Sequence, residues 1–321
     1  MSLTSIIRDR ADIREGLRAR VVRPPIQFGT IQALPLTEHY GIVGTAFDYL
    51  LRFYLQRINT AAKASEWVAE AGVELIGASD LAYDLDRRQI SRTVDRQRRK
   101  AEKYLEDAKR AHRAYLTSGA VRDELLVAAL RLAHLDIAYR VGPHRIDWKG
   151  LDAPDARDMA DLRALLALVP ETKFKAKTVC LLNPTFGDAS RLVAGADADV
   201  LIDDCLIDIK NTKESHIDSR DFLQLIGYYL LHGYAGISCG NSKTSSNPVN
   251  SLAIYYSRYG LLWKFRVEEV LARDRLKEAA RWFFDSICRS KAMRATYLRR
   301  FHGALATCLR PLDSKPRKRR A

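Results

Sequence analysis

The stretch Gly195-Ala-Asp-Ala-Asp-Val-Leu-Ile-Asp-Asp-Cys-Leu-Ile-Asp-Ile-Lys210 decides the fold that we predict for this chain. Two short apolar runs, residues 200–202 and 206–209, lie on either side of Asp203-Asp204-Cys205. This central segment is short and polar enough for a hairpin turn. The stretch therefore predicts two antiparallel strands, each of which brings a carboxylate to the same end of the pair.

The second of these strands carries both a carboxylate and an ammonium group. Because side chains alternate between the two faces of a strand, Asp208 and Lys210 share one face, while Ile207 and Ile209 point the opposite way into a core. Asp199 joins them from the neighbouring strand. Burying such charges is costly unless they bind something. A hard divalent cation held by oxygen atoms, with a lysine beside it, would remove that cost.

Three motifs in this chain resemble those of one enzyme superfamily. Asp199, an apolar strand and then Asp208-Ile209-Lys210 resemble the metal-binding core of the PD-(D/E)XK nucleases. The stretch Gln224-Leu-Ile-Gly-Tyr228 matches the Gln-x-x-x-Tyr motif of the RecB-like branch. Upstream, Gly44-Thr-Ala-Phe-Asp48 resembles Gly-Thr-x-x-His in the first helix of that branch, with Asp48 at the position where histidine is common. An isolated Asp-x-Lys arises often by chance, so the ordered set carries the resemblance.

The resemblance implies a fold and an activity. The fold is α/β (α+β), a restriction-endonuclease-like core with a mixed central sheet flanked by helices and with a large helical insertion. The activity is that of a Mg²⁺-dependent deoxyribonuclease, a metal-dependent nuclease that hydrolyses phosphodiester bonds, with DNA as the expected substrate. The alternative is a catalytically inactive nucleic-acid-binding or scaffold protein of the same fold, although such a protein would be expected to lose at least one motif residue.

The resemblance also implies roles for individual residues. Mg²⁺ or Mn²⁺ would be bound by Asp199, Asp208, the carbonyl oxygen of Ile209 and, directly or through water, Asp48. Such an ion would polarise the scissile phosphate and lower the pKa of a water molecule. Lys210 would orient that water or offset the negative charge of the transition state. Gln224 and Tyr228 would contact the nucleic acid or support Lys210.

Two choices of residue stay open in the sequence. Asp197 is the rival of Asp199, because it lies two residues earlier on the same strand face. Asp48 lies beside the apolar stripe of a helix expected over residues 41–58, where it could instead pair with Arg52 at i+4. Either Glu124 or Asp136 could then replace Asp48 as the acid on a helix.

Composition limits the partners and the compartment. The formal net charge of +14 favours a polyanionic partner such as nucleic acid, although a basic surface also serves solubility. No segment is apolar for the eighteen or so residues that a membrane span needs, and charges from Arg8 to Arg14 interrupt any signal peptide. We therefore expect a cytoplasmic protein without a membrane partner, and the sequence identifies no protein partner.

The cysteines lack the clustered spacing that is typical of an iron–sulfur site. The five are Cys180, Cys205, Cys239, Cys288 and Cys308, without close C-x-x-C spacing. Some RecB-like nucleases carry an iron–sulfur cluster held by clustered cysteines. We predict neither such a cluster nor a disulfide framework here.

The chain divides into four parts on its composition. Residues 1–40 are expected to be a loosely structured lead-in, because prolines interrupt them. The resemblance implies that residues 41–60 and 170–270 form the nuclease core, with further strands expected at 178–182, 251–257 and 261–267. Residues 61–169 form a helical insertion almost without strand signal. Residues 271–321 contribute helices and a basic tail at 315–320.

Arginine and lysine dominate residues 84–116 within the insertion. Such a run is usually a solvated helix face, and the alternative is a basic arm on a phosphate backbone. The tail at 315–320 has the same two interpretations. A glycine- and serine-rich stretch at 240–248 is expected to form a loop near the cleft.

Overall fold

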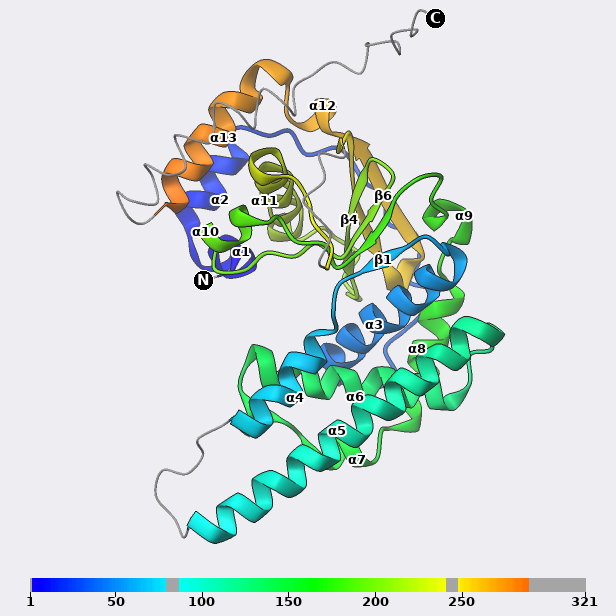
Figure 1. The fold of residues 1–321 in the computed structure, drawn as a ribbon. Coiled ribbons are helices and arrows are strands. Elements are labelled where there is room, and N and C mark those ends of the chain that lie inside the picture. Colours follow the sequence, from blue (N-terminus) through cyan, green and yellow to red (C-terminus); the bar gives the residue numbers. More distant parts are fainter. Residues whose placement is uncertain (1, 79–86, 241–247, 289–321) are drawn as a thin grey trace, which may run out of the picture.

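A six-stranded mixed sheet forms the centre of the computed structural model, which describes residues 2–78, 87–240 and 248–288 (Figure 1). The strands lie side by side in chain order, and only the pairs β1–β2 and β4–β5 are parallel. Their bounds are β1 Lys63–Ala64, β2 Cys180–Leu182, β3 Val200–Ile202, β4 Cys205–Lys210, β5 Ser251–Tyr256 and β6 Leu261–Arg266. A mixed sheet flanked by helices agrees with the expected α+β class.

The hairpin expected from the sequence is present as β3 and β4. Its turn is one residue shorter than predicted, because Ile202 pairs with Cys205 and only Asp203-Asp204 connects the strands. Asp203 takes the positive φ of 52° that the turn needs. The Asp203 carboxylate also accepts hydrogen bonds from the backbone N–H groups of residues 177–179, at 2.8–3.1 Å. The turn is thereby tied to the segment that leads into β2.

Alternation along the strands builds a separate core on each face of the sheet. Leu201 and Leu206 belong to one core, whereas Val200, Ile202 and Ile207 belong to the other. Ile209 packs against the same core as Ile207, so Asp208 and Lys210 are on the opposite face. The predicted division of β4 into an apolar face and a charged face is confirmed.

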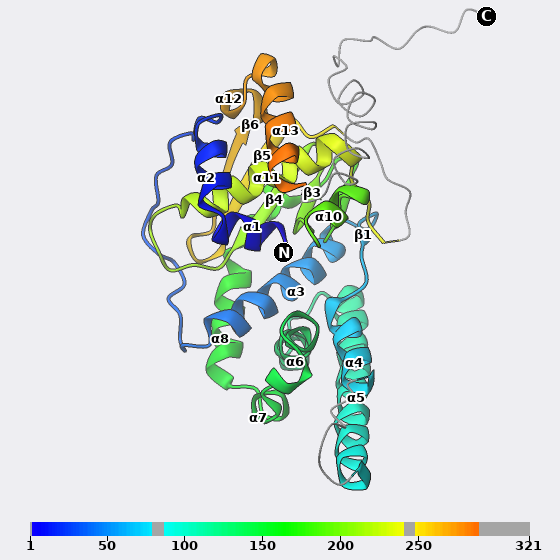
Figure 2. The ribbon, with the colours of Figure 1, turned by 90° about the vertical axis from the view of Figure 1, so that its left-hand side faces the viewer.

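The first face is covered by helices from both ends of the chain: α1 Leu3–Asp9, α2 Ala11–Arg18, α11 Ser219–Ala235 and α13 Arg273–Ile287 (Figure 2). The expectation of a loosely structured lead-in is wrong for residues 3–18. Leu3, Ile6, Ile7, Ile13 and Leu17 are buried in this core. Such short helices are only marginally stable alone and depend on packing. Charged residues between these apolar positions also interrupt the hydrophobic pattern, so the sequence did not predict the helices.

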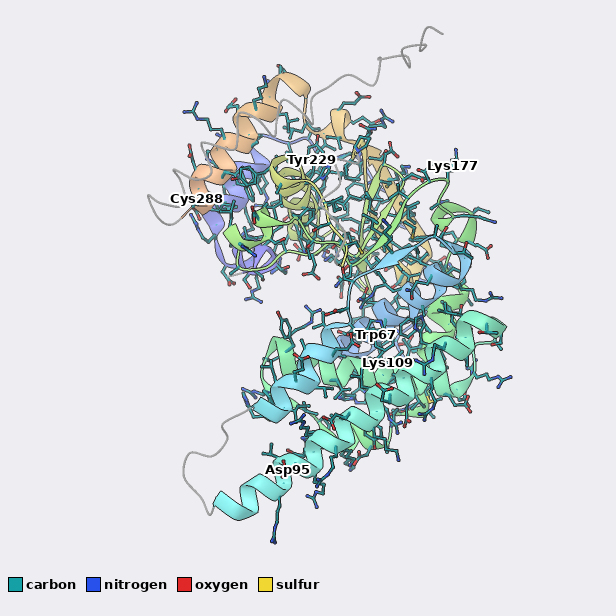
Figure 3. The ribbon with its side chains drawn as sticks, in the orientation of Figure 1. Trp67, Asp95, Lys109, Lys177, Tyr229 and Cys288 are labelled. Atoms are coloured by element: carbon teal, nitrogen blue, oxygen red, sulfur yellow. The ribbon has the colours of Figure 1, made fainter. Side chains whose placement is uncertain are left out.

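The second face is covered by the helices of the expected insertion, by α3 and by α9, which lies in the range 170–270 predicted for the core. Their bounds are α3 Tyr40–Ile58, α4 Val68–Ala78, α5 Arg87–Ser118, α6 Asp123–Arg140, η1 Pro143–Arg145, α7 Trp148–Asp152, α8 Ala156–Ala167 and α9 Glu171–Phe174. Lys109 of α5 pairs with Glu70 of α4 at 2.8 Å (Figure 3). The unexpected element is β1, two residues that extend the sheet and are too few to leave a periodic signal.

Three short elements complete the described chain: α10 Asp188–Leu192, η2 Ser257–Tyr259 and α12 Val267–Val270. The strands expected at 251–257 and 261–267 are present as β5 and β6, with η2 between them. The loop interpretation of 241–247 and the tail at 315–320 lie outside the described residues. Among the described helices, none combines the length and apolar character that crossing a membrane requires.

A half-buried histidine is expected to give the insertion a pH-dependent stability. His112 of α5 stacks on Phe53 of α3, with ring centroids 4.2 Å apart, and burial lowers its pKa to about 4. The His112 imidazole therefore takes up a proton near pH 6.5 in the unfolded chain but only near pH 4 in the folded chain. We expect His112 to lower the free energy of unfolding as the pH falls through that window, by at most ~3 kcal/mol before solvent screening reduces it.

The measurement is urea unfolding of the wild type and of His112→Gln between pH 4 and 7.5. The difference between the two should change across the window and stay constant above pH 7. Parallel curves at every pH would show that His112 titrates normally.

Candidate active site

Asp208 and Lys210 form an ion pair on the face of β4 that meets α11. Asp208 Oδ2 lies 2.9 Å from Lys210 Nζ, and Asp208 is only 3% exposed. Burial alone would lower the pKa of Lys210, but the neighbouring carboxylates of Asp208 and Asp221 raise it above its ordinary value. Lys210 is therefore a protonated, positively charged group at neutral pH.

Asp199 lies beside this pair, at the start of β3. Its Oδ2 accepts a hydrogen bond of 2.6 Å from the backbone N–H of Ile209, which fixes the carboxylate against β4. Burial, together with repulsion from Asp208 and Asp48, raises the pKa of Asp199 well above the usual range. Asp199 is thus close enough to be affected by both of the other carboxylates, Asp48 and Asp208, that the sequence predicts at this site.

Asp197 has different neighbours. It forms an isolated bridge with Thr185, and burial raises its pKa. Its strongest charged neighbours are Arg140, Asp48, Arg52 and Asp136. Of the two rivals, Asp199 is the one that adjoins the Asp208–Lys210 pair.

Only one of the two carboxylate oxygens of Asp48 on α3 forms a hydrogen bond with a described residue. Its Oδ2 accepts a hydrogen bond from Arg52 Nη2 at 2.5 Å, which is the i+4 pairing that the sequence left open. Its Oδ1 is buried and accepts no hydrogen bond from any described residue. A buried carboxylate oxygen without a partner is costly, so this atom is open to a further ligand.

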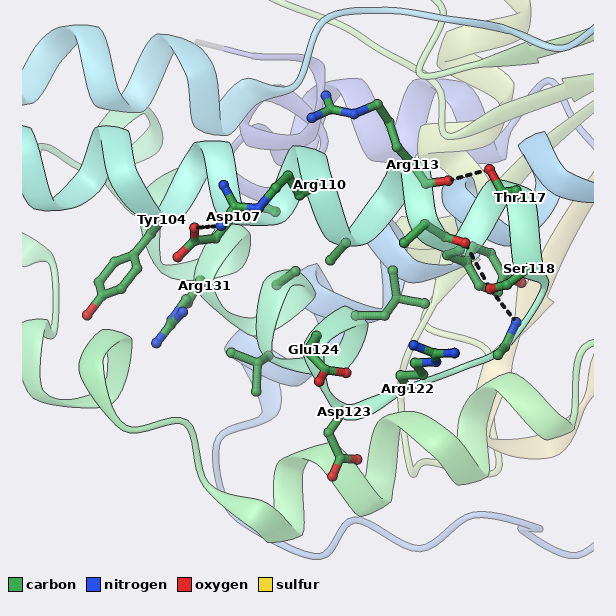
Figure 4. A pocket seen from close by; sticks show the side chains of 18 residues that line it. Tyr104, Asp107, Arg110, Arg113, Thr117, Ser118, Arg122, Asp123, Glu124 and Arg131 are labelled. Atoms are coloured by element: carbon green, nitrogen blue, oxygen red, sulfur yellow. Dashed lines mark hydrogen bonds and ion pairs between the residues drawn. The ribbon is translucent and has the colours of Figure 1, made fainter.

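The two alternative helical acids are placed differently. Asp136 uses both oxygens, accepting from Tyr49 Oη at 3.1 Å and from Arg140 Nε at 3.0 Å. Glu124 is exposed in a groove between α5 and α6, about 18 Å along α6 from Asp136 (Figure 4). Neither has the open, buried oxygen that Asp48 has.

The Gln-x-x-x-Tyr helix contacts Lys210 through a chain of side chains. Lys210 Nζ donates to Gln224 Oε1 at 3.3 Å, and Gln224 Nε2 donates to Tyr228 Oη at 2.6 Å. Tyr228 in turn stacks on Phe186, with ring centroids 5.4 Å apart. Their spacing of four places both side chains on one face of α11. In this arrangement Gln224 and Tyr228 support Lys210, and within the described part of the chain their hydrogen bonds are to side chains rather than to backbone groups.

Sequence reasoning missed two groups that hold this arrangement. Asp221 Oδ1 lies 3.6 Å from Lys210 Nζ, and burial raises the pKa of Asp221 to about 6. Its i, i+3 spacing to Gln224 was a signal that both side chains share a face. Thr4 of α1 accepts a hydrogen bond from Gln224 Nε2 at 3.0 Å. Nothing in the sequence relates residue 4 to residue 224.

Acidic groups outnumber basic ones in this region. Six carboxylates and three cations influence one another here: Asp48, Asp136, Asp197, Asp199, Asp208 and Asp221, with Arg52, Arg140 and Lys210. If all were ionised, the region would carry three uncompensated negative charges, six minus three. Oxygen-only donors with excess negative charge are the chemistry that Mg²⁺ and Mn²⁺ prefer. The open Oδ1 of Asp48 fits the same chemistry.

The side chains do not form a closed metal cage. Within residues 2–78, 87–240 and 248–288, no group of three or more His, Cys, Asp or Glu side chains is gathered so as to hold a metal ion. Cys180 and Cys205 are buried strand residues, as expected of small core side chains. Comparison of the chain with protein-family models, with curated proteins and with solved structures gave no match.

Proposed function

We propose that this chain is a metal-dependent nuclease of the PD-(D/E)XK superfamily, RecB-like branch, which hydrolyses phosphodiester bonds of DNA. One observation carries the proposal. Lys210 is held between Asp208 and Gln224, with Asp199 beside Asp208, on strands whose other side chains are core residues. A half-buried lysine among carboxylates has no packing role that an apolar residue would not fill better.

The donor set suits a hydrated divalent cation. Asp199 and Asp208, with the Ile209 carbonyl and with Asp48 directly or through water, would hold Mg²⁺ or Mn²⁺. Mg²⁺ commonly uses one or two protein carboxylates and keeps several waters, so a three-carboxylate cage is unnecessary. When bound, such an ion polarises a phosphate and lowers the pKa of water.

The residues of this chain would perform the remaining work. Lys210 presents a compact positive charge that can offset negative charge on the phosphate in the transition state. Gln224 and Asp221 hold its ammonium group in place, and Tyr228 and Thr4 hold Gln224. A group fixed before substrate arrives stabilises the transition state without reorganising.

A catalytically inactive nucleic-acid-binding protein is the second candidate, and the Asp48–Arg52 pair favours it. Arg52 compensates the charge of Asp48, which stands where the family commonly has histidine. One experiment separates the candidates: incubation of the pure protein with linear, circular and single-stranded DNA in Mg²⁺, Mn²⁺ or EDTA. Cleavage that requires the metal supports the nuclease, and binding without cleavage under every condition supports the second candidate.

Replacing Asp48 by alanine should weaken metal binding. We expect a roughly tenfold lower apparent affinity for Mg²⁺ and lower activity, partly restored by excess Mn²⁺, because an oxygen donor is lost. Activity titrated against each metal measures this. The controls are Asp136→Ala, whose oxygens are already bonded, and Glu124→Ala, whose side chain is exposed. If Asp48→Ala is fully active and either control variant is inactive, then Asp48 is not the carboxylate that a helix contributes to the metal site.

Replacing Asp221 by asparagine should slow turnover without affecting substrate binding. The substitution keeps the shape and removes the negative charge that helps to hold Lys210. We expect kcat to fall about tenfold, equivalent to ~1.4 kcal/mol, with KM unchanged. Asp218→Asn is the matched control, because Asp218 caps the same helix and pairs with Arg220 instead of Lys210. An equal fall of kcat in both variants would mean that Asp221 acts only through helix stability.

A further inference from the structure

One face of α5 carries a row of exposed cations that the proposed active site does not use. Arg92, Arg96, Arg99 and Lys103 are all exposed and recur at intervals of four, three and four residues. At 3.6 residues per turn this spacing keeps them in a single stripe along the helix, roughly 16 Å long. We call these four residues the basic stripe.

The basic stripe lies opposite the face by which α5 packs. Ala101, Leu105, Ala108 and Tyr115 are the buried side chains of the helix, and they are about half a turn from the stripe. The N-terminal end of α5 extends past α6 and α7, where side chains such as Asp95 project from it (Figures 1 and 3). The stripe therefore makes no contribution to the core and faces outward.

Several other cations of the same helix have acidic partners, whereas the stripe has none among the residues that the structure describes. Arg98 pairs with Glu102 at 2.8 Å, Lys109 with Glu70 at 2.8 Å, and Lys100 with Asp152. No member of the stripe forms an ion pair with any side chain in the described ranges. Like charges at i, i+4, such as Arg92 with Arg96 and Arg99 with Lys103, repel one another slightly, and a bound anion would relieve that repulsion.

We propose that the basic stripe binds the phosphate backbone of a DNA duplex, as a surface separate from the site at Lys210. A duplex carries one charge per roughly 1.7 Å of its axis, so a straight row of cations can face several phosphates at once. Four arginine and lysine side chains without base-reading geometry would supply affinity independent of sequence. The choice of DNA as ligand rests on the proposed function, whereas binding by the stripe is measured without cleavage.

The test compares two variants of equal charge. The stripe variant combines Arg92→Gln, Arg96→Gln, Arg99→Gln and Lys103→Gln, since glutamine has a similar helix propensity. The control combines Lys264→Gln, Arg275→Gln, Lys277→Gln and Arg281→Gln, which are exposed cations elsewhere without described ion pairs. Each lowers the net charge from +14 to +10. Circular dichroism confirms that both are folded.

Duplex binding is measured in EDTA by fluorescence anisotropy from 25 to 300 mM salt. The slope of log Kd against log salt should fall by three to four units in the stripe variant, about 0.9 for each lost phosphate contact, and by less than one in the control. An equal change of slope in both variants would show that only the net charge of the protein matters. An unchanged slope in the stripe variant would show that the stripe does not bind the duplex. Wild-type binding to polyglutamate as tight as to duplex would assign the stripe to an acidic protein instead.

The same variants separate this proposal from the proposed function. If the wild type cleaves DNA, the stripe variant should keep its kcat at saturating substrate while KM rises. If the wild type binds duplex through the stripe but cleaves no DNA, the binding proposal is supported and the nuclease proposal is contradicted. Loss of kcat in the stripe variant at saturating DNA would contradict a surface separate from the site.

Discussion

Lys210→Ala is expected to abolish phosphodiester cleavage while the protein still binds divalent metal. The substitution leaves Asp199 and Asp208 in place and removes a positive charge 2.9 Å from Asp208, so metal affinity should persist or rise. Turnover should fall by at least ~10²–10³-fold, because the group that offsets transition-state charge is gone.

Asp208→Ala should fail in a different way. It removes a metal ligand, so both cleavage and the affinity for Mg²⁺ or Mn²⁺ should fall. Stability without metal should hold or rise, since repulsion with Asp199 is relieved and Lys210 retains Asp221 and Gln224. Calorimetric metal titration and single-turnover cleavage of both variants measure the contrast. If both variants still cleave DNA, the assignment of the active site to Asp208 and Lys210 is wrong.

Asp161→Ala is expected to have the largest effect on stability. Asp161 of α8 and Arg258 of η2 are each 1% exposed and are joined by two hydrogen bonds of 2.9 Å. Arg258 also donates to the carbonyl of Ala33 at 3.1 Å. Removing Asp161 leaves a buried guanidinium without its counter-charge, which costs ~3–5 kcal/mol. Urea unfolding measures the loss.

Two further variants test the cause of that loss. Asp161→Leu combined with Arg258→Met removes both charges, so its stability should return toward the wild-type value. Arg98→Ala breaks an exposed pair of 2.8 Å and should have no measurable effect. If the double variant is as unstable as Asp161→Ala, packing and not the unpaired charge explains the loss.

Local patterns were sufficient to predict much of the fold. The hairpin of β3 and β4, the opposed faces of β4 and the pair β5–β6 follow from apolar runs, alternation and turn residues. The helices at residues 3–18 were missed because their stability comes from packing on α11 and α13, which no local pattern reports. The Asp161–Arg258 pair joins residues 97 positions apart and was equally invisible.

The candidate site divides in the same way. Spacing alone placed Asp208 with Lys210, and Gln224 with Tyr228. The contact between Lys210 and Gln224 depends on how α11 packs against β4, which spacing does not specify. Asp48, Glu124 and Asp136 are all acids on helices, so only their positions in the fold distinguish them: Glu124 is exposed, whereas Asp48 and Asp136 differ in their hydrogen bonds. Asp197 and Asp199 lie two residues apart ahead of β3, so their spacing does not distinguish them, whereas the hydrogen bond from the Ile209 N–H identifies Asp199 as the neighbour of β4.

The most direct test of the central claim is anomalous diffraction from crystals of the wild-type protein grown with Mn²⁺. The account predicts an anomalous peak within ligand distance of both Asp199 and Asp208, and its loss in crystals of Asp208→Ala. A wild-type crystal saturated with Mn²⁺ whose peaks all lie away from Asp199 and Asp208 would contradict it.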